Sequence, residues 1–386
     1  MRVTVVGAGP AGLLFSLLAK RRRPAWRIEL IEQNPANATY GFGVVFSEGA
    51  LGFLERDEPE LLRVLTAAMQ AWPIQRIVHR DERVDIDGSG FSAIGRLALL
   101  EVLQGLCRDA GVKLEYGRAF ASLAEATGAD LVVGADGANS IVRGSMAAQF
   151  EPAIELLTNR FAWYGTRQVF ECLTLTFREN ADGAFVAHHY RHSPSMSTFV
   201  VECDALTWKK AGLDRMSDAE ARAYCERVFA PDLGGHALVS NKSVWRRFSL
   251  LSNRRWSSGN CVLIGDALRT VHFSIGSGTR LALEDAIALD RAFGEAGEDV
   301  PRALAAFEGE RRPIVEKLLA AANASSYWYE RFPEKMREEP LRLAYDYMTR
   351  SGRMTDDRLR LVAPDFMARV DAARAAGRAG RPGTAC

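Results

Sequence analysis

The first 32 residues constrain the fold of this chain more than any other segment. Residues 2–6 are an apolar run that predicts a short buried strand, and residues 13–20 have the apolar character of a buried helix. Between them stands the glycine-rich sequence GAGPAG, and a second strand predicted at residues 27–31 ends beside Glu32. We interpret this order as a βαβ unit, because a helix between two such strands lets them pair in parallel.

The glycines of this turn, Gly7, Gly9 and Gly12, are spaced as in dinucleotide-binding βαβ units. Glycine lets the backbone turn sharply and approach a pyrophosphate, and the N-terminus of the following helix offers unpaired N–H groups to the anion. Glu32 stands twenty residues after Gly12, where a carboxylate accepts hydrogen bonds from a ribose. We therefore expect an ADP-containing cofactor; the alternative is a glycine-rich turn that binds nothing.

The composition narrows the class of protein. The 386 residues include 49 lysines and arginines against 48 acidic residues, so the net charge of +1 provides no basic field for nucleic acid. No apolar run approaches the roughly 20 residues of a membrane helix. The N-terminal apolar segment precedes its basic cluster, unlike a signal peptide, and the six cysteines form no CxxC pair. We expect a cytoplasmic protein of about two domains, with reduced cysteines, no nucleic-acid partner and no membrane span.

Two further predicted strands end near acidic residues. Residues 130–134 precede Asp136, and residues 261–264 precede Asp266. In an open α/β sheet, ligands bind at the edge where the carboxyl ends of the strands meet. We therefore expect both aspartates to lie near the glycine-rich turn. The ordinary alternative for each is that it caps the helix that follows.

Three motifs occur along the chain in a fixed order: GAGPAG at residues 7–12, GADGANSIVR at residues 134–143 and LIGDALRTVHFSIGSGT at residues 263–279. Together they resemble the flavin-dependent aromatic hydroxylases of the para-hydroxybenzoate hydroxylase fold. The segments WYGTRQVFE (163–171) and STFVVEC (197–203) resemble more narrowly the branch of salicyloyl-CoA 5-hydroxylase and 2-aminobenzoyl-CoA monooxygenase. The violacein-pathway tryptophan hydroxylase shares part of this set. The proline that many relatives carry after the GD motif is absent here.

The resemblance implies an α/β fold, α+β overall, in which a Rossmann-type FAD-binding domain carries an inserted β-sheet substrate domain and C-terminal helices. We expect the FAD-binding domain to be discontinuous, at residues 1–80, 91–158 and 255–300. The remaining boundaries are expected at residues 159–254 for the substrate-binding sheet, 301–370 for the C-terminal helices and 371–386 for a flexible tail.

The resemblance also implies FAD that is bound tightly but not covalently. At the adenosine end, the pyrophosphate would lie against the turn and the ribose against Glu32. The residues of the turn carried over from the family are Gly7, Gly9, Pro10, Ala11 and Gly12.

At the flavin end, Arg96 would reach the phosphate–ribityl region and Asp266 the ribityl hydroxyls. Asp136 belongs to a motif that the family associates with both FAD and NAD(P)H. The residues expected around the isoalloxazine ring are Gly43, Val44, Val45, Gly276, Gly278 and Thr279.

The implied activity is that of a single-component monooxygenase. NAD(P)H would reduce the flavin as a transient co-substrate, and O2 would then hydroxylate an electron-rich aromatic ring through a flavin C4a-hydroperoxide. The narrower resemblance suggests an aryl-CoA thioester such as salicyloyl-CoA as the substrate. An indole or tryptophan-like substrate, another free aromatic metabolite, a non-oxygenating flavin reductase and a flavin-containing binding protein stay open as alternatives. The oligomeric state stays open between monomer and dimer.

Four side chains are candidates for contact with the substrate: His188, Tyr190, Tyr164 and His272. His188 and Tyr190 point to one side of a predicted strand, where a histidine can polarise or deprotonate a ring hydroxyl or amine. The alternative is a histidine satisfied within the sheet or exposed on it. We expect no metal site, because alternate residues of a strand diverge. The paired or triple arginines at residues 21–23, 246–247, 254–255 and 311–312 are candidates for CoA phosphates, although a solvated face is their ordinary interpretation.

Overall fold

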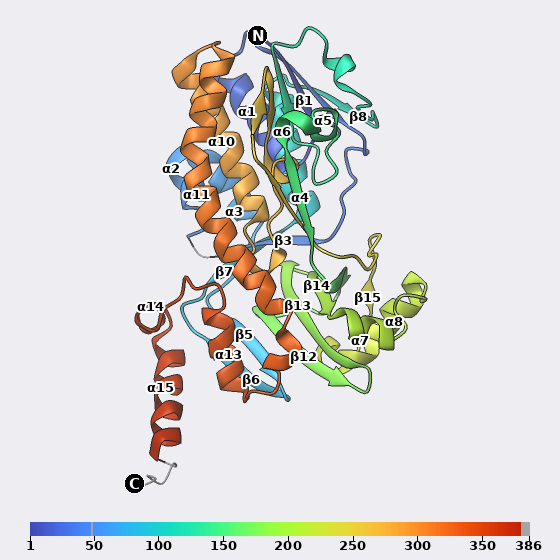
Figure 1. Ribbon diagram of the computed structural model, residues 1–386, viewed down its shortest axis with the longest axis vertical. Helices are drawn as coiled ribbons and strands as arrows, with labels where there is room; N and C mark the ends of the chain where they lie inside the picture. Colours follow the sequence, from blue (N-terminus) through green and yellow to red (C-terminus); the bar gives the residue numbers. More distant parts are fainter. Residues whose placement is uncertain (48, 380–386) are drawn as a thin grey trace. The chain divides into compact units, whose positions relative to one another are not determined.

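The structure is a computed structural model that describes residues 1–47 and 49–379 (Figure 1). The chain forms two compact units. Unit 1 comprises Met1–Met69, Ile94–Leu157 and Arg247–Asn323, and unit 2 comprises Gln70–Ala93, Thr158–Arg246 and Ala324–Cys386. Each unit therefore assembles its core from three segments that are far apart in the sequence.

Unit 1 is built on a six-stranded sheet with the strand order β17-β18-β9-β1-β2-β8. The strands are β1 (Arg2–Val6), β2 (Arg27–Glu32), β8 (Lys113–Tyr116), β9 (Leu131–Gly134), β17 (Ser257–Ser258) and β18 (Cys261–Leu263). All neighbouring strands pair in parallel except β17 and β18. β1 and β9 are almost entirely buried, as expected for central strands of a parallel sheet that helices cover on both faces.

Helix α1 (Pro10–Arg22) is the central helix of unit 1. Residues 11–19 are all buried, because α1 packs against α4 (Arg96–Asp109) and α10 (Gly278–Ala296). The other elements of this unit are β3 (Gly43–Ser47), α2 (Gly52–Asp57), α3 (Pro59–Ala67), η1 (Leu123–Ala126), α5 (Ile141–Ser145), α6 (Ala147–Phe150), β10 (Pro152–Leu156), its antiparallel partner β16 (Ser249–Asn253), η2 (Gly265–Ala267), η3 (Phe273–Ile275) and the first part of α11 (Val300–Tyr329).

Unit 2 is built on a seven-stranded sheet with the strand order β15-β11-β14-β13-β12-β5-β6. The strands are β5 (Gln75–His79), β6 (Glu82–Ile86), β11 (Arg160–Thr166), β12 (Leu173–Asn180), β13 (Gly183–Ser193), β14 (Met196–Cys203) and β15 (Leu238–Val239). Neighbours are antiparallel except for β5 and β12. β4 (Gln70–Trp72) and β7 (Phe91–Gly95) form an antiparallel pair outside this sheet.

Alternate residues of β13 pack on opposite faces of the unit 2 sheet. Val186 belongs to a core formed with C-terminal helices, whereas Phe185 and Ala187 belong to a second core on the other face. The helices of the first face are the end of α11, α12 (Phe332–Lys335), α13 (Pro340–Thr349), α14 (Asp356–Val362) and α15 (Pro364–Ala379). The helices of the second face are α7 (Ala205–Lys210), α8 (Asp218–Val228) and α9 (Ala230–Leu233).

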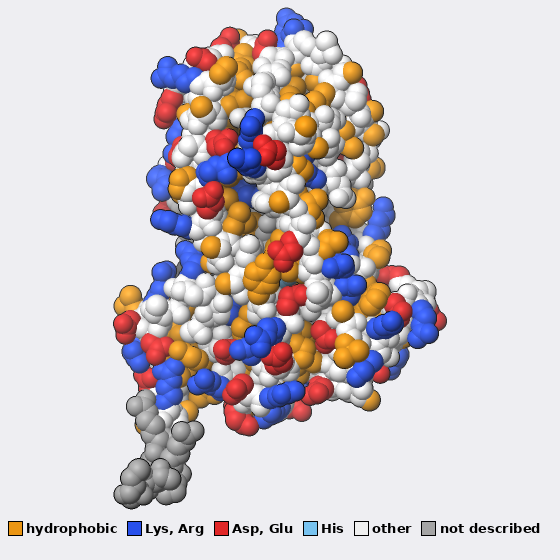
Figure 2. All heavy atoms as spheres, viewed as in Figure 1, with side chains coloured by type: hydrophobic (Ala, Val, Ile, Leu, Met, Phe, Trp, Pro, Cys, Tyr) orange, Lys and Arg blue, Asp and Glu red, His pale blue; other side chains and the backbone are white. Residues whose placement is uncertain are grey.

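The surface carries both signs of charge. Figure 2 shows lysines and arginines interspersed with acidic side chains on the face in view, in agreement with the net charge of +1. Among the described residues, no helix combines the length and the apolar character needed to cross a membrane.

The expected fold class is confirmed, because a mainly parallel sheet with helices occurs together with a separate, mainly antiparallel sheet. The boundaries differ from those we expected. Residues 75–79 pair with β12 and thus belong to unit 2, and residues 249–253 pair with β10 and thus belong to unit 1. The C-terminal helices do not form a separate part, since α11 is divided between the units at residue 323.

The tail that we expected to be flexible from residue 371 remains helical further along the chain. α15 extends to Ala379, and its residues Phe366, Met367 and Val370 are buried in the core of unit 2. Residues 380–386, including the thiol of Cys386, lie outside the described residues.

Candidate active site

The glycine-rich turn between β1 and α1 has a shape that requires glycine at two positions. Gly7 has φ +102°, and a Cβ at this position would lie 2.4 Å from the carbonyl oxygen of Ala135. A Cβ on Gly12 would lie 2.1 Å from the carbonyl oxygen of Gly7. Around Gly9, no heavy atom of the described residues beyond its chain neighbours lies within 4 Å of the Cβ position. Gly7 and Gly12 therefore shape the turn, and Gly9 leaves the N-terminus of α1 accessible to an anion.

Glu32 ends β2 with its carboxylate held beside this turn. Oε2 accepts the backbone N–H of Ala8 at 2.9 Å, and Oε1 accepts the backbone N–H and the side-chain amide of Asn34 at 2.8 and 2.7 Å. A carboxylate has about four acceptor positions, so Glu32 retains capacity for a ribose hydroxyl. Its position therefore fits the expected role.

Asp266 lies in η2, directly after β18. Its side chain is exposed, yet the surrounding protein removes enough water to raise the pKa of its carboxyl, which the positive charges of Arg96 and Arg269 oppose. Among the residues described, no hydrogen bond to the Asp266 carboxylate is present, so the helix-capping alternative finds no support. An accessible carboxylate at the carboxyl edge of the sheet is suited to accept ligand hydroxyls.

Asp136 shows the opposite outcome. Its Oδ2 accepts the backbone N–H groups of Ile141 and Val142 at 2.7 and 3.2 Å, at the start of α5. Burial raises the pKa of its carboxyl, and these hydrogen bonds lower it. The geometry of Asp136 is that of a residue that organises a helix N-terminus, so its expected part in cofactor binding stays a prediction.

The residues expected around the flavin lie in two segments of unit 1 that contact one another. Gly276 has φ +60°, and a Cβ there would lie 3.2 Å from the carbonyl oxygen of Val45 in β3. Gly278 and Thr279 begin α10. The backbone N–H of Arg96 donates to the backbone oxygen of Phe42 at 2.8 Å, so the start of α4 is fixed to the residue before β3. These contacts bring Gly43, Val44 and Val45 together with the expected partners from the third motif.

His272 has a structural role in unit 1. Its ring is 2% exposed, stacks on Phe273 at a centroid distance of 4.3 Å and meets the ring of Phe248 at 4.8 Å. Its Nδ1 accepts the backbone N–H of Ser274 at 3.4 Å, which caps η3. These contacts of His272 stabilise the turn at η3, and its expected catalytic role stays a prediction.

His188 and Tyr190 lie on β13 in unit 2 and share one face of the sheet. Nε2 of His188 lies 3.6 Å from Oε2 of Glu202, a carboxylate that is only 2% exposed. The side-chain amide of Asn159 donates to Oε1 of Glu202 at 2.8 Å and to the backbone oxygen of Tyr329 at 2.8 Å. The His188 ring lies tilted against the ring of Tyr329, with a centroid distance of 5.0 Å and an interplanar angle of 32°. His188 is thus an imidazole beside a buried, oriented carboxylate, which is the arrangement of a general base.

Tyr164 does not join these residues. It pairs with Phe199, which in turn pairs with His189, so Tyr164 and His189 occupy the face of the sheet opposite to His188. Burial raises the pKa of the Tyr164 phenol far above its ordinary value. His189 lies between Phe170 and Phe199 and contacts the Thr176 hydroxyl at 2.9 Å, and burial lowers its pKa to about 3. Both side chains therefore belong to the core of that face.

Sequence patterns did not lead us to Glu202 or Asn159. A signal for Glu202 was present, because it is the only charged residue of STFVVEC, in an otherwise apolar or hydroxyl-bearing strand. A lone carboxylate in a buried strand requires a partner. Nothing in the sequence around Asn159 indicated that it would supply one.

Most of the arginine clusters are engaged within the chain. Arg22 and Arg23 pair with Asp290, Arg254 and Arg255 with Glu151, and Arg311 and Arg312 with acidic residues of α10 and α11. Arg246 is exposed and forms no ion pair among the described residues; its Nε donates to the backbone oxygen of Val244 at 3.4 Å. Across residues 1–47 and 49–379, no three His, Cys, Asp or Glu side chains are arranged as a metal site.

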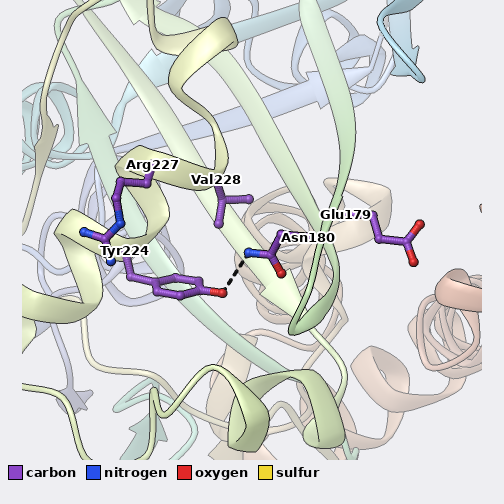
Figure 3. Close-up of a pocket in the computed structure, with 5 residues that line it drawn as sticks. All are labelled: Glu179, Asn180, Tyr224, Arg227 and Val228. Carbon is purple, nitrogen blue, oxygen red and sulfur yellow. Dashed lines mark hydrogen bonds between the residues drawn. The ribbon is translucent and has the colours of Figure 1, made fainter.

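A cavity of about 250 Å³ in unit 2 is lined by Glu179, Asn180, Tyr224, Arg227 and Val228 (Figure 3). Two polar side chains of its wall contact each other: the Asn180 amide donates to the Tyr224 hydroxyl at 2.9 Å, and this hydroxyl donates to Asp182 at 2.6 Å. None of the predicted site residues lines it, and we assign it no role.

The donor set of unit 1 fits a flavin adenine dinucleotide. An accessible helix N-terminus suits the pyrophosphate, and Glu32 and Asp266 offer carboxylate oxygens to hydroxyl groups at two places along the sheet edge.

Comparisons of the sequence with known proteins agree with an FAD site in this chain. A family model described as an FAD binding domain matches residues 117–322, more than half of the chain. The chain is 40% identical to a salicyloyl-CoA 5-hydroxylase of a Streptomyces species, over 91% of this chain and 70% of the relative. It is 38% identical to the 3-hydroxy-4-methyl-anthranilyl-[aryl-carrier protein] 5-monooxygenase of Streptosporangium sibiricum, over 92% of this chain and 95% of the relative.

A third relative, the protodeoxyviolaceinate monooxygenase of Chromobacterium violaceum, is 36% identical over 87% of this chain and 91% of its own. Among solved structures, a tetrameric 2-methyl-3-hydroxypyridine-5-carboxylic acid oxygenase superposes with a TM-score of 0.67 at 18% identity, over 94% of this chain and 95% of the other. This last similarity concerns the fold.

Proposed function

The chain belongs to the FAD-binding family of flavin-dependent aromatic monooxygenases, and we propose that its substrate is an aromatic acid presented as a thioester. FAD, NAD(P)H and O2 are the cofactor and co-substrates of this enzyme class. The five cysteines described are free and buried, which supports a cytoplasmic location, where NAD(P)H is supplied.

One observation carries the substrate proposal. The relatives at 40% and 38% identity are named for ring substrates that are attached to CoA or to an aryl-carrier protein. Both names place a hydroxyl or amino group on the ring, which makes the ring electron-rich. We therefore propose a hydroxy- or aminobenzoyl thioester such as salicyloyl-CoA.

Reduced FAD with O2 supplies the oxygen atom that is transferred to the ring. In our proposal, the chain contributes the binding and proton-transfer groups. The turn at Gly9 and the first turn of α1 would hold the pyrophosphate, Glu32 the ribose, and Asp266 the ribityl hydroxyls. On unit 2, His188 would accept the proton of the ring hydroxyl or amine, with Glu202 holding its imidazole ring.

The test is NADH and NADPH oxidation by the purified holoenzyme with a small panel of aromatic compounds. The panel contains salicyloyl-CoA, 2-aminobenzoyl-CoA, the two free acids and tryptophan, and product masses are recorded under ¹⁸O2. We expect one thioester to stimulate NAD(P)H oxidation and to yield a product that carries one labelled oxygen atom. Stimulation by a free acid alone would refute the thioester handle while keeping the reaction.

An indole substrate is the second candidate, favoured by the 36% identity to the protodeoxyviolaceinate monooxygenase. Tryptophan in the panel represents this class. Labelled product from tryptophan and none from either thioester would replace our proposal with this candidate.

The cofactor role of Asp266 has a separate test. Asp266→Asn removes the charge with little change of shape, and we expect the variant to be purified with less flavin than the wild type. Asp130→Asn is the matched control, because Asp130 is also exposed but precedes β9, at the end of the strand opposite to the carboxyl edge, where it accepts the backbone N–H of Arg2 at 2.6 Å. Full flavin content in Asp266→Asn would contradict the assignment.

A further inference from the structure

We propose that Asp285 is a positioning residue for FAD binding, which fixes the loop of Gly265 and Asp266 from behind. The inference rests on the proposed role of Asp266. Asp285 lies in α10, is fully buried, and stands after the motif at residues 263–279 from which Asp266, Gly276, Gly278 and Thr279 were predicted.

Asp285 contacts the loop directly. Its Oδ2 accepts the backbone N–H of Gly265 at 3.1 Å. The same carboxylate is bound by both terminal nitrogens of Arg269, with Nη1 to Oδ2 at 2.6 Å and Nη2 to Oδ1 at 3.0 Å. The carboxylate thus holds the loop at two points, on either side of Asp266. Paired bonds from a planar guanidinium fix orientation as well as distance.

The loop has little room to adjust. Gly265 has φ +60°, and a Cβ there would lie 3.2 Å from the Cβ of Ala11 and 3.5 Å from the Cβ of Ala282. The loop is therefore wedged between the first turn of α1 and helix α10. Because the turn at α1 is the expected pyrophosphate site, the position of Gly265 sets where the Asp266 carboxylate lies relative to it.

The charge of Asp285 is compensated by more than one arginine. Arg311 of α11 donates to Oδ1 of Asp285 at 3.3 Å and pairs with Glu284 at 2.9 Å, and Arg280 pairs with Glu284 at 2.8 Å. Three guanidinium groups thus surround two carboxylates. A buried, fully paired carboxylate has a defined place at every physiological pH, since guanidinium groups do not lose their proton.

Asp290 offers a matched control within the same helix. It is also fully buried and also bound by two arginines, Arg22 and Arg23, the latter at 2.6 Å. No contact of Asp290 with the loop at Gly265 is present among the described residues. Asp285→Asn and Asp290→Asn therefore remove the same charge from similar surroundings, and only the first acts on the loop.

The experiment measures FAD affinity of apoprotein prepared from wild type, Asp285→Asn, Asp290→Asn and Asp266→Asn, by titration of flavin fluorescence. Folding is checked by circular dichroism and by the urea midpoint. We expect Asp285→Asn to raise the Kd of FAD by about tenfold or more, which corresponds to about 1.4 kcal/mol. We expect Asp285→Asn and Asp290→Asn to lower the urea midpoint by similar amounts. Asp290→Asn should change the Kd of FAD less than about threefold, about 0.65 kcal/mol.

Equal FAD affinity in the Asp285 and Asp290 variants would overturn the inference, since Asp285 would then be merely structural. If Asp266→Asn binds FAD as wild type does, the proposed role of Asp266 fails, and the inference fails with it. Weak binding by Asp266→Asn together with unchanged binding by Asp285→Asn refutes the inference alone. Should Asp285→Asn not fold, Arg269→Lys keeps the charge but loses the paired bonds, and an unchanged Kd in that variant would also overturn the inference.

Discussion

The two units bury charge in different ways. In unit 1, Asp285 and Asp290 are fully buried, and each contacts two arginines. In unit 2, Glu202 is buried to a similar degree, but it contacts the amide of Asn159 and lies near the imidazole of His188. A guanidinium keeps its charge at all physiological pH values, whereas an imidazole does not. The charges that surround Asp285 and Asp290 are thus permanent, whereas Glu202 lies beside a side chain of a type that can gain or lose a proton.

The distribution of histidines follows the same division. Five of the six lie in unit 2, namely His79, His188, His189, His192 and His236, and His272 alone lies in unit 1. A cofactor that stays bound through many turnovers needs a scaffold with constant geometry. A group that takes a proton from a substrate must change its charge, and we propose that this difference separates the tasks of the two units.

The largest expected effect comes from Asp285→Leu. The substitution leaves the guanidinium groups of Arg269 and Arg311 without their shared carboxylate in a buried site. Breaking a buried pair by removing one partner destabilises by about 3–5 kcal/mol. The measurement is urea unfolding of the whole protein at pH 7.5, monitored by far-UV circular dichroism.

The double variant Asp285→Leu with Arg269→Met is the control for this prediction. Replacing both partners by apolar side chains removes the unpaired charge, so part of the lost stability should return. A single variant as stable as the wild type would show that the carboxylate is dispensable, and the contrast between the units would be lost.

The second prediction concerns mild acid and acts mainly on unit 2. Burial lowers the pKa of His189 to about 3 and that of His192 to about 4. Both values lie below the unfolded value of about 6.5, so the stability from these neutral rings is present above that pH and is lost as the pH falls toward the folded values. Each ring loses about 1.4 kcal/mol per pH unit, so unit 2 should be about 2–3 kcal/mol less stable at pH 5.5.

Two other aspartates of unit 1 act in the opposite direction. The surrounding protein removes water from the carboxyl groups of Asp266 and Asp136 and raises their pKa, so the folded state binds their protons more readily, and this contribution to stability increases as the pH falls. The measurement is the urea midpoint at pH 7.5 and 5.5 for wild type and for the double variant His189→Gln with His192→Gln. An equal acid-induced loss in both proteins would contradict the assignment to these two rings.

The candidate cofactor residues of unit 1 could be predicted from the sequence, because the contacts that fix their positions are local. Gly7 and Gly12 are required by contacts within a single turn and its neighbouring loop, and such contacts leave a fixed spacing. Glu32 is the last residue of β2 and Asp266 lies three residues after β18, so their place at the sheet edge follows from the strand pattern.

The candidate substrate contacts of unit 2 could be predicted only in part, because they are fixed by contacts between segments that are distant in the sequence. The shared face of His188 and Tyr190 follows from strand periodicity, but the pairing register that places Tyr164 on the opposite face does not. Glu202 and its partner Asn159 are 43 positions apart, and their contact depends on this same register. In the sequence, Asp285 is one polar position of an amphipathic helix. The sequence alone does not show that its carboxylate accepts the backbone N–H of Gly265.

The smallest expected effect on stability comes from Glu202→Gln. Glutamine keeps the shape of the side chain and an oxygen for the Asn159 amide, so we expect unit 2 to lose about 1 kcal/mol or less. The effect on the reaction should be larger, because the carboxylate beside the His188 imidazole loses its charge. If His188 takes the substrate proton, kcat should fall by about tenfold or more.

Asp232→Asn provides the matched control in the same unit. Asp232 is also a carboxylate with little exposure, but its partner is Arg178, whose guanidinium it binds at 2.9 Å through both oxygens. Its loss should therefore reduce stability more than Glu202→Gln does and leave kcat unchanged. If the two variants lower kcat equally, the loss of either carboxylate of unit 2 slows the reaction, and nothing distinguishes His188 as the base. If neither variant lowers kcat, Glu202 serves only folding, and the base is another residue of the chain.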